Sequence, residues 1–201
     1  MKLTEKEIAE LRKLALLKNK HSIHDDYVYI AGERLEFARQ EVIPPSVRVM
    51  LPRTFLNLPP AIARQTYPSE HRPTVIKTNP SMTVNFAFQH FKEELPMEEV
   101  VTCTHYYLAT MKKLYPGNEY LENSEHFIDE ERTRVLGWYS FRNPALEGHI
   151  YNIHAFTNLE DRLLYCTFLT DTRNRFEQWK PFAFEVFDSV TSGREKGGDF
   201  L

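Results

Sequence analysis

The chain has 201 residues, of which 42% are hydrophobic and 13% aromatic, enough to build a packed core and too many for a disordered chain. Its 25 Lys and Arg against 28 Asp and Glu give a formal charge of −3, which lacks the basic excess typical of nucleic-acid binding. No apolar run approaches the roughly 18 residues of a transmembrane helix, and the opening residues lack the apolar region of a signal peptide, so we expect a cytoplasmic protein.

The first part of the chain is predicted to form a helix followed by short strands. Residues 3–18 repeat apolar side chains at helical spacing, with Thr4 as N-cap and Glu7 three residues later. A polar linker, KNKHSIHDD, comes next. The run YVYIAGERLEFARQEVI is typical of two strands around an Ala-Gly turn, and SVRVMLP of a further short strand.

A proline-rich stretch, LPRTFLNLPPAIARQTYPSEHRP, follows over Leu51–Pro73. Pro59 and Pro60 suit the start of a short helix, PAIARQTY, and Pro68 ends it. Two strands, TVIKTN and SMTVNFAFQH, are predicted after it. The second strand alternates apolar with mostly polar residues, which predicts a sheet with one well-buried face; the apolar set is Met82, Val84, Phe86 and Phe88.

The second half is predicted to hold two long helices around a strand meander. The first helix covers 97–115, with acids in its first turn, lysines in its last, and one apolar face that includes Val100, Thr104 and Leu114. Strands are expected at roughly 119–127, 133–142, 147–156 and 162–171. A closing helix over 173–190 contains Pro181, which predicts either a start near Trp179 or a kink.

This order of elements lacks regular βαβ crossovers. It predicts an α+β domain with a mostly antiparallel sheet flanked by helices, preceded by the N-terminal helix. The chain contains no GxGxxG, P-loop, HExxH, GxSxG or EF-hand motif, so the enzyme classes that such motifs reveal are excluded and we expect no cofactor. Its two cysteines, Cys103 and Cys166, are expected to be buried free thiols.

Two short segments are candidate sites. His21 and His24, with Asp25 and Asp26, could hold a divalent transition metal; the alternative, which we expect, is a solvated linker. In YPSEHRP, Arg72 could anchor an anion while Glu70 and His71 act as an acid–base pair. Here too the alternative is a turn with solvated charges.

The second face of the predicted sheet is a third candidate. Polar and aromatic side chains on one face suit recognition of a partner protein, because they bury area and keep a hydrogen-bonding tip. Alternatively, the N-terminal segment or a helix covers this face. The sequence leaves open how the strands align with one another. The residues expected on this face are Asn85, Gln89, Tyr139, His149, Tyr151 and Tyr165.

The segment Val47–Phe88 resembles a group of small uncharacterised bacterial proteins, chiefly from Gram-positive anaerobes. Together with WKP (179–181) and DSV (188–190), it is similar to the PsbP-like αβα sandwich over roughly residues 33–191. That superfamily includes a photosystem II extrinsic subunit and a Ran-binding nuclear transport factor. We therefore expect an N-terminal helix and linker over 1–32, a PsbP-like domain over 33–191 and a flexible tail over 192–201.

The resemblance implies a non-enzymatic protein-interaction or accessory module whose partner is another protein, and it transfers no catalytic residue. The alternative function is a small-ligand binder or hydrolase built around Glu70, His71 and Arg72, with His149 or His154 nearby. A fold does not by itself give a function, so both alternatives stay open at this point.

Overall fold

The computed structural model describes residues 21–67 and 72–193. These residues contain a seven-stranded sheet in which every neighbouring pair is antiparallel, in the order β5-β6-β7-β11-β10-β9-β8. The consecutive strands β8, β9, β10 and β11 are neighbours in the sheet and form the predicted meander. The seven strands are β5 (Leu56–Asn57), β6 (Val75–Thr78), β7 (Val84–Glu94), β8 (Glu119–Phe127), β9 (Val135–Ala145), β10 (Gly148–Leu159) and β11 (Arg162–Thr170).

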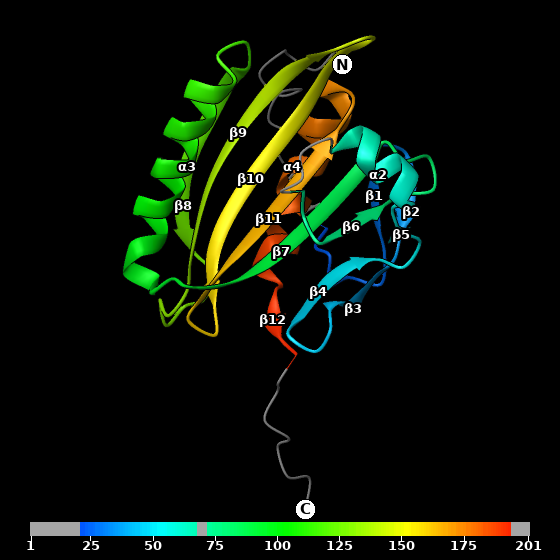
Figure 1. The fold of residues 1–201 in the computed structure, drawn as a ribbon. Coiled ribbons are helices and arrows are strands. Elements are labelled where there is room, and N and C mark those ends of the chain that lie inside the picture. The colour runs from blue at the N-terminus through cyan, green and yellow to red at the C-terminus, as the bar shows by residue number, and fades with distance from the viewer. Residues whose placement is uncertain (1–20, 68–71, 194–201) are drawn as a thin grey trace, which may run out of the picture.

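Helices cover both faces of this sheet (Figure 1). On one face α3 (Val100–Leu114), preceded by the 3₁₀ turn η1 (Met97–Glu99), contacts β9 and β10. The short helix α2 (Pro60–Thr66) lies on the same face, where Ala63 packs with Ile76 and Ala87. On the opposite face α4 (Arg173–Asp188) contacts β10 and β11. The result is an αβα arrangement.

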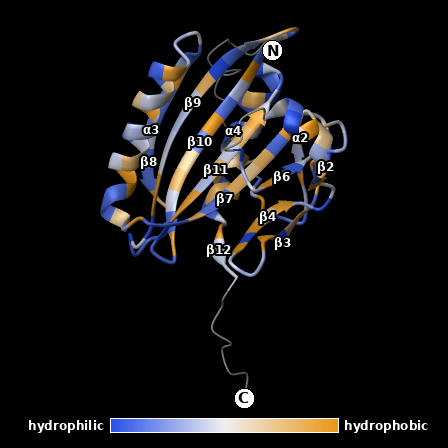
Figure 2. Ribbon diagram, in the orientation of Figure 1, coloured by the Kyte–Doolittle hydropathy of each residue, from blue (hydrophilic) through white to orange (hydrophobic). Residues whose placement is uncertain are grey.

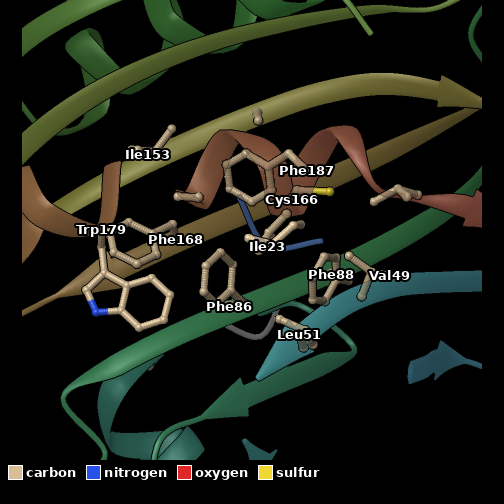
Figure 3. Close-up of a cluster of buried hydrophobic side chains, with 14 of the residues drawn as sticks. Ile23, Val49, Leu51, Phe86, Phe88, Ile153, Cys166, Phe168, Trp179 and Phe187 are labelled. Carbon is tan, nitrogen blue, oxygen red and sulfur yellow. The ribbon is translucent and has the colours of Figure 1, made fainter. Parts of the chain in front are cut away.

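Two small sheets complete the α4 side. The first pairs β1 (Val28–Ile30) with β2 (Glu33–Leu35), and the second has the order β12-β4-β3. Its strands are β3 (Phe37–Ile43), β4 (Val47–Pro52) and β12 (Thr191–Ser192). Val49 and Leu51 of β4 pack against the main sheet in the same apolar cluster as Phe86 and Phe88 (Figure 3).

The larger core lies between the main sheet and α4. Phe86 of β7 is its centre, with ring centroids 5.1 Å from Phe168, 5.9 Å from Trp179 and 6.0 Å from Phe187. Aromatic pairs at such separations contribute about 0.5–1.5 kcal/mol each beyond the area that they bury. Figure 2 shows apolar and polar residues interspersed along the long strands. Because successive side chains of a strand point to opposite faces, this pattern directs apolar side chains into the core.

Pro181 lies inside α4, which begins at Arg173 and continues to Asp188. The helix therefore does not start near Trp179. A proline inside a helix loses one backbone hydrogen bond and costs about 3 kcal/mol. The apolar stripe of α4 offsets this cost, because the predicted Phe176, Trp179, Ala183 and Val186 are all buried against the sheet.

Over the described residues, the predicted order of elements is confirmed, with local corrections. YVYIAGERLEFARQEVI forms three strands rather than two, because β2 ends at Leu35 and β3 begins at Phe37. Met82 precedes β7 and is exposed instead of facing the core. On α3 the buried residues are Val100, Thr104 and Leu108, whereas Leu114 is 62% exposed near the end of the helix.

The predicted boundary at residue 32 falls within the β1–β2 hairpin. Ala31 and Gly32 form its turn with φ angles of 51° and 82°, left-handed values that glycine adopts without strain. Ile23, Val28 and Ile30 are buried in the same cluster as the main sheet. The described part of this segment therefore packs as part of one core, while the predicted helix over 3–18 lies outside the described residues. No helix that the structure describes is long and apolar enough to span a membrane.

Candidate functional site

A tyrosine–histidine cluster, defined as Tyr139, His154 and Tyr165, lies on the α3 face of the sheet. Tyr139 of β9 is directly opposite His154 of β10. Tyr165 of β11 is opposite Phe156, two residues along the strand from His154. Both phenol oxygens approach the same imidazole nitrogen, Nδ1, at 3.1 Å from Tyr139 and 3.0 Å from Tyr165.

Burial sets the charge state of this cluster. It lowers the pKa of His154 to about 3 and raises the pKa values of the Tyr139 and Tyr165 phenols well above their usual value. All three side chains are therefore neutral at physiological pH. Efficient acid–base catalysis needs a pKa close to the working pH, so the cluster is suited to hydrogen bonding rather than to proton transfer.

Toward β7, three polar atoms on the same side of the sheet lack a hydrogen bond of normal geometry to a described residue. They are Asn85 Oδ1, Thr167 Oγ1 and the Tyr67 hydroxyl. Tyr67 follows α2 and points toward Thr167 of β11, and burial raises the pKa of its phenol. Thr167 is directly opposite His154, so these atoms extend the polar region of the cluster toward β7.

The face predicted from sequence is corrected in two places. Asn85, Gln89, Tyr139 and Tyr165 share the α3 face, but strand alternation sends His149 and Tyr151 to the α4 face. The Tyr151 ring stacks there on Phe176, with centroids 5.3 Å apart. Gln89 accepts a hydrogen bond of 2.8 Å from the backbone N–H of Thr74. A binding role for any of these residues stays a prediction.

His154 is the member of the cluster that the sequence prediction of this face omitted. Its neighbours Ile153 and Ala155 are buried on the α4 side. The alternation of β10 therefore assigns His154 to the same face as Asn152 and Phe156. The alternation along β10 therefore indicates the face of His154, but only the register between β10 and its neighbouring strands places it beside Tyr139 and Tyr165.

The charged segment before β6 is described in part. Glu70 and His71 lie outside the described residues, so their predicted acid–base pairing stays untested. Arg72 is exposed and, with Arg64 of α2, lines a hollow of about 190 Å³ between α2 and β6. We call it the α2–β6 hollow; its other lining residues include Leu58, Ala63, Thr74 and Ile76.

A larger hollow of about 440 Å³, the α3–β8 hollow, opens between the start of α3 and the end of β8. Val135 at its base is buried, and Phe127 of β8 is 47% exposed beside it. The Arg132 guanidinium lies 5.1 Å from the Phe127 ring centroid. The hollow is lined by Met97, Glu98, Val101, Glu125, His126, Phe127 and Val135.

His126 borders the hollow, but its side chain leaves β8 on the α4 face, where its ring lies near Phe184. Its Nε2 lies 2.9 Å from Asp188 Oδ1 at the end of α4. The hydrogen bond to Asp188 raises the pKa of His126, and burial opposes this only in part. The pair ties β8 to α4 behind the α3–β8 hollow.

The His21–Asp26 segment is a turn anchored to α4. Glu185 Oε2 accepts hydrogen bonds from the Ser22 hydroxyl at 2.7 Å and from the Ile23 N–H at 2.9 Å. His21 and His24 are exposed, and His21 Nδ1 lies 3.7 Å from Asp25. The described residues contain no group of three or more His, Cys, Asp or Glu side chains that could hold a metal ion.

The two cysteines lie on opposite sides of the main sheet. Cys166 of β11 is buried in the core with α4 as predicted, whereas Cys103 on α3 is only partly buried. Both are free thiols. Burial raises both pKa values, and Glu99 adds to the effect at Cys103. A raised thiol pKa disfavours the reactive thiolate, so neither residue is suited to be a nucleophile.

No protein-family model and no curated protein matches the chain. Its structure is similar to CyanoP, the cyanobacterial PsbP of Synechocystis sp., with a TM-score of 0.54 and 12% identity over 78% of this chain and 92% of CyanoP. It is also similar to the Ran-binding protein Mog1p of Saccharomyces cerevisiae, with a TM-score of 0.53 and 10% identity over 78% of this chain and 95% of Mog1p.

A protein from Bacteroides thetaiotaomicron has a TM-score of 0.50 and 12% identity, over 81% of this chain and 51% of that protein. Identities this low show a shared fold and no shared activity. The resemblance predicted from sequence is therefore supported at the level of the fold, while membership of a particular sequence family stays a prediction. The chain has a PsbP/Mog1-like α+β fold, with a large antiparallel sheet and few helices.

Proposed function

We propose that the protein is a non-enzymatic interaction module that binds a segment of another protein in the α3–β8 hollow. The observation that carries this proposal is the size and apolar base of that hollow, beside a half-exposed phenylalanine. Its volume of about 440 Å³ falls within the range of roughly 300–1,000 Å³ that is usual for ligand pockets.

The lining favours an apolar anchor. Met97 and Val101 are partly buried and pack in the same cluster as the buried Val135. Phe127 adds an aromatic surface that is 47% exposed. Inserting an apolar side chain removes these surfaces from water, and full burial of one large side chain contributes about 1.5–3 kcal/mol. Such anchors in pockets dominate the energy of many interfaces.

The negative charge around the hollow favours a partner segment that carries positive charge. Glu98 and Glu125 line the hollow and are exposed, and Glu130 and Glu131 are exposed in the loop that follows β8. Arg132 is also exposed, but its guanidinium lies over the Phe127 ring. A partner segment with Lys or Arg next to its apolar anchor complements this charge. Exposed pairs of this kind affect specificity and the rate of association more than affinity.

The chemistry of the other candidate residues supports a binding role over a catalytic one. The tyrosine–histidine cluster is neutral at physiological pH, and both thiols have raised pKa values. Mog1p, which shares the fold, is described as a Ran-binding protein; it offers a precedent for partner binding on this scaffold and names no partner for this chain. A cytoplasmic location and a bacterial family from Gram-positive species are part of the same proposal, supported by the sequence patterns.

A peptide selection tests the proposal. Random twelve-residue peptides displayed on phage are selected on the protein, and the dissociation constant of the best synthetic peptide is measured. We expect enriched peptides to combine an aromatic or large aliphatic residue with Lys or Arg. Phe127→Ala should weaken binding by about 10-fold or more.

The matched control is Tyr106→Ala, because Tyr106 is an exposed aromatic on the outer side of α3, 68% exposed and absent from the lining of the hollow. This variant should bind the peptide as the wild type does. Failure to enrich any peptide, or an equal loss of affinity in both variants, would count against the proposed site.

A further inference from the structure

The α2–β6 hollow is lined by two arginines and shares no lining residue with the α3–β8 hollow. Arg64 lies in the last turn of α2, and Arg72 precedes β6. Both arginines line the hollow and both are exposed. No Asp or Glu of the described residues lines it. Two positively charged residues thus border one hollow.

We propose that this hollow is an anion-binding site for a small ligand that carries a phosphate or a carboxylate group. A guanidinium presents several N–H donors in a fixed plane and binds both groups through paired hydrogen bonds. Two guanidiniums at one hollow can engage different oxygens of the same anion. This inference is independent of the proposed protein-binding function.

The base of the hollow is apolar. Leu58, Ala63 and Ile76 are buried and apolar, and they contribute to the lining beside the arginines. Charges that face an apolar surface are less screened by water than charges on an open surface. Thr74, also in the lining, is held by Gln89, whose Oε1 accepts hydrogen bonds from its N–H and its hydroxyl.

Volume limits the ligand. About 190 Å³ corresponds to roughly six water molecules at about 30 Å³ each. That space suits a phosphate or carboxylate group with a small apolar body, which would contact the apolar base. A whole nucleotide is larger than this hollow, and the two arginines that line it supply donors for binding an anion.

Titration with phenyl phosphate and with benzoate, followed by ¹H–¹⁵N NMR at constant ionic strength, tests the proposal and distinguishes the two anion types. We expect saturable shifts of backbone amides within 58–64 and 74–76 for at least one probe. The double substitution Arg64→Gln and Arg72→Gln should weaken binding by at least 10-fold. Arg64→Lys with Arg72→Lys should retain part of the affinity, because the charge is kept.

Arg53→Gln is the matched control, because Arg53 is exposed and does not line the hollow. It should bind the probes as the wild type does, and the thermal midpoint of each variant reports whether it is folded. Shifts that fail to saturate, shifts outside this region, or equal weakening by Arg53→Gln would overturn the proposal. A negative result here leaves the peptide-binding proposal unaffected, since that test uses another hollow and other variants.

Discussion

Thr104 of α3 lies directly over Gly137 of β9, so closely that a Cβ atom on Gly137 would overlap the threonine hydroxyl. The same hydroxyl donates a hydrogen bond of 2.8 Å to the carbonyl of Val100. Val100 and Leu108 are buried on either side of this contact. The absence of a side chain at Gly137 thus sets how closely α3 packs on the sheet, and α3 forms one wall of the α3–β8 hollow.

Gly137→Ala should therefore destabilise the protein. The added methyl group has no space, because the nearest atoms belong to Thr104 on a packed helix, and overpacking of this kind typically costs about 1–3 kcal/mol. Thr104→Ala in the same chain removes the obstructing hydroxyl and should recover part of the loss. Urea unfolding of the two single variants and the double variant measures this coupling. If the double variant is as unstable as the sum of its parts, the contact does not control the packing of α3.

The losses of stability on removing the two phenol hydroxyls that share His154 Nδ1 should be non-additive. Either Tyr139→Phe or Tyr165→Phe leaves the other hydroxyl within reach of the nitrogen, so each should cost only about 0.5–1.5 kcal/mol. The double variant leaves the nitrogen without either partner, and an unsatisfied buried group costs about 1–3 kcal/mol. We expect the double loss to exceed the sum of the single losses in a urea-unfolding cycle. Simple additivity would indicate that the two tyrosines act independently.

His154 should make the protein sensitive to acid, because partial burial beside Tyr139 and Tyr165 lowers its pKa. Its folded pKa is about 3, below the value of about 6.5 for an unfolded chain. Between these values the unfolded state takes up a proton that the folded state does not, so stability is full above pH 6.5 and falls as the pH drops toward 3. The slope from this one group is at most about 1.4 kcal/mol per pH unit. His154→Gln should remove this pH dependence in urea unfolding between pH 4.5 and 7, and an unchanged slope would show that folding does not lower the pKa of His154.

The His126–Asp188 pair should act in the opposite direction. The folded pKa of His126 is raised, so its stabilisation is complete below the unfolded pKa of about 6.5 and is lost as the pH rises through the folded pKa. Both side chains are about one-third exposed, which limits the effect to about 0.5–1 kcal/mol. The stability gap between the wild type and His126→Gln should narrow by that amount from pH 6 to pH 8. His105→Gln, at an exposed histidine of α3, should show no such narrowing. If the stability gap changes with pH equally in both variants, the hydrogen bond to Asp188 does not cause the effect.

The long elements were predictable from sequence because their periodicity is strong and local. The stripe Phe176, Trp179, Ala183, Val186 and Phe187 identified α4 despite Pro181. Apolar alternation along Val84, Phe86 and Phe88 identified β7. Tertiary packing determines two features that periodicity does not: the continuity of α4 and the buried face of α3. Burial of the α4 stripe keeps the helix continuous through the proline, and the real α3 face includes Leu108 in place of the exposed Leu114.

The candidate sites were less predictable because they depend on register between distant strands. Tyr151 and His154 lie three residues apart on β10, and alternation places them on opposite faces. No local pattern relates His154 to Tyr165 on the next strand. The α3–β8 hollow combines residues near 97–101 with residues near 125–135, and Arg64 joins Arg72 only once α2 packs beside β6. Such combinations exist only in the folded chain.

The most direct test of the account is to locate where a selected peptide binds. ¹H–¹⁵N NMR of the labelled protein, titrated with that peptide, reports the contact surface residue by residue. We predict that the largest amide shifts fall within 97–101, 125–127 and at Val135, and that Phe127→Ala weakens them while Tyr106→Ala does not. Saturable shifts confined to another surface, or shifts that survive Phe127→Ala unchanged, would contradict the claim that the α3–β8 hollow is the binding site.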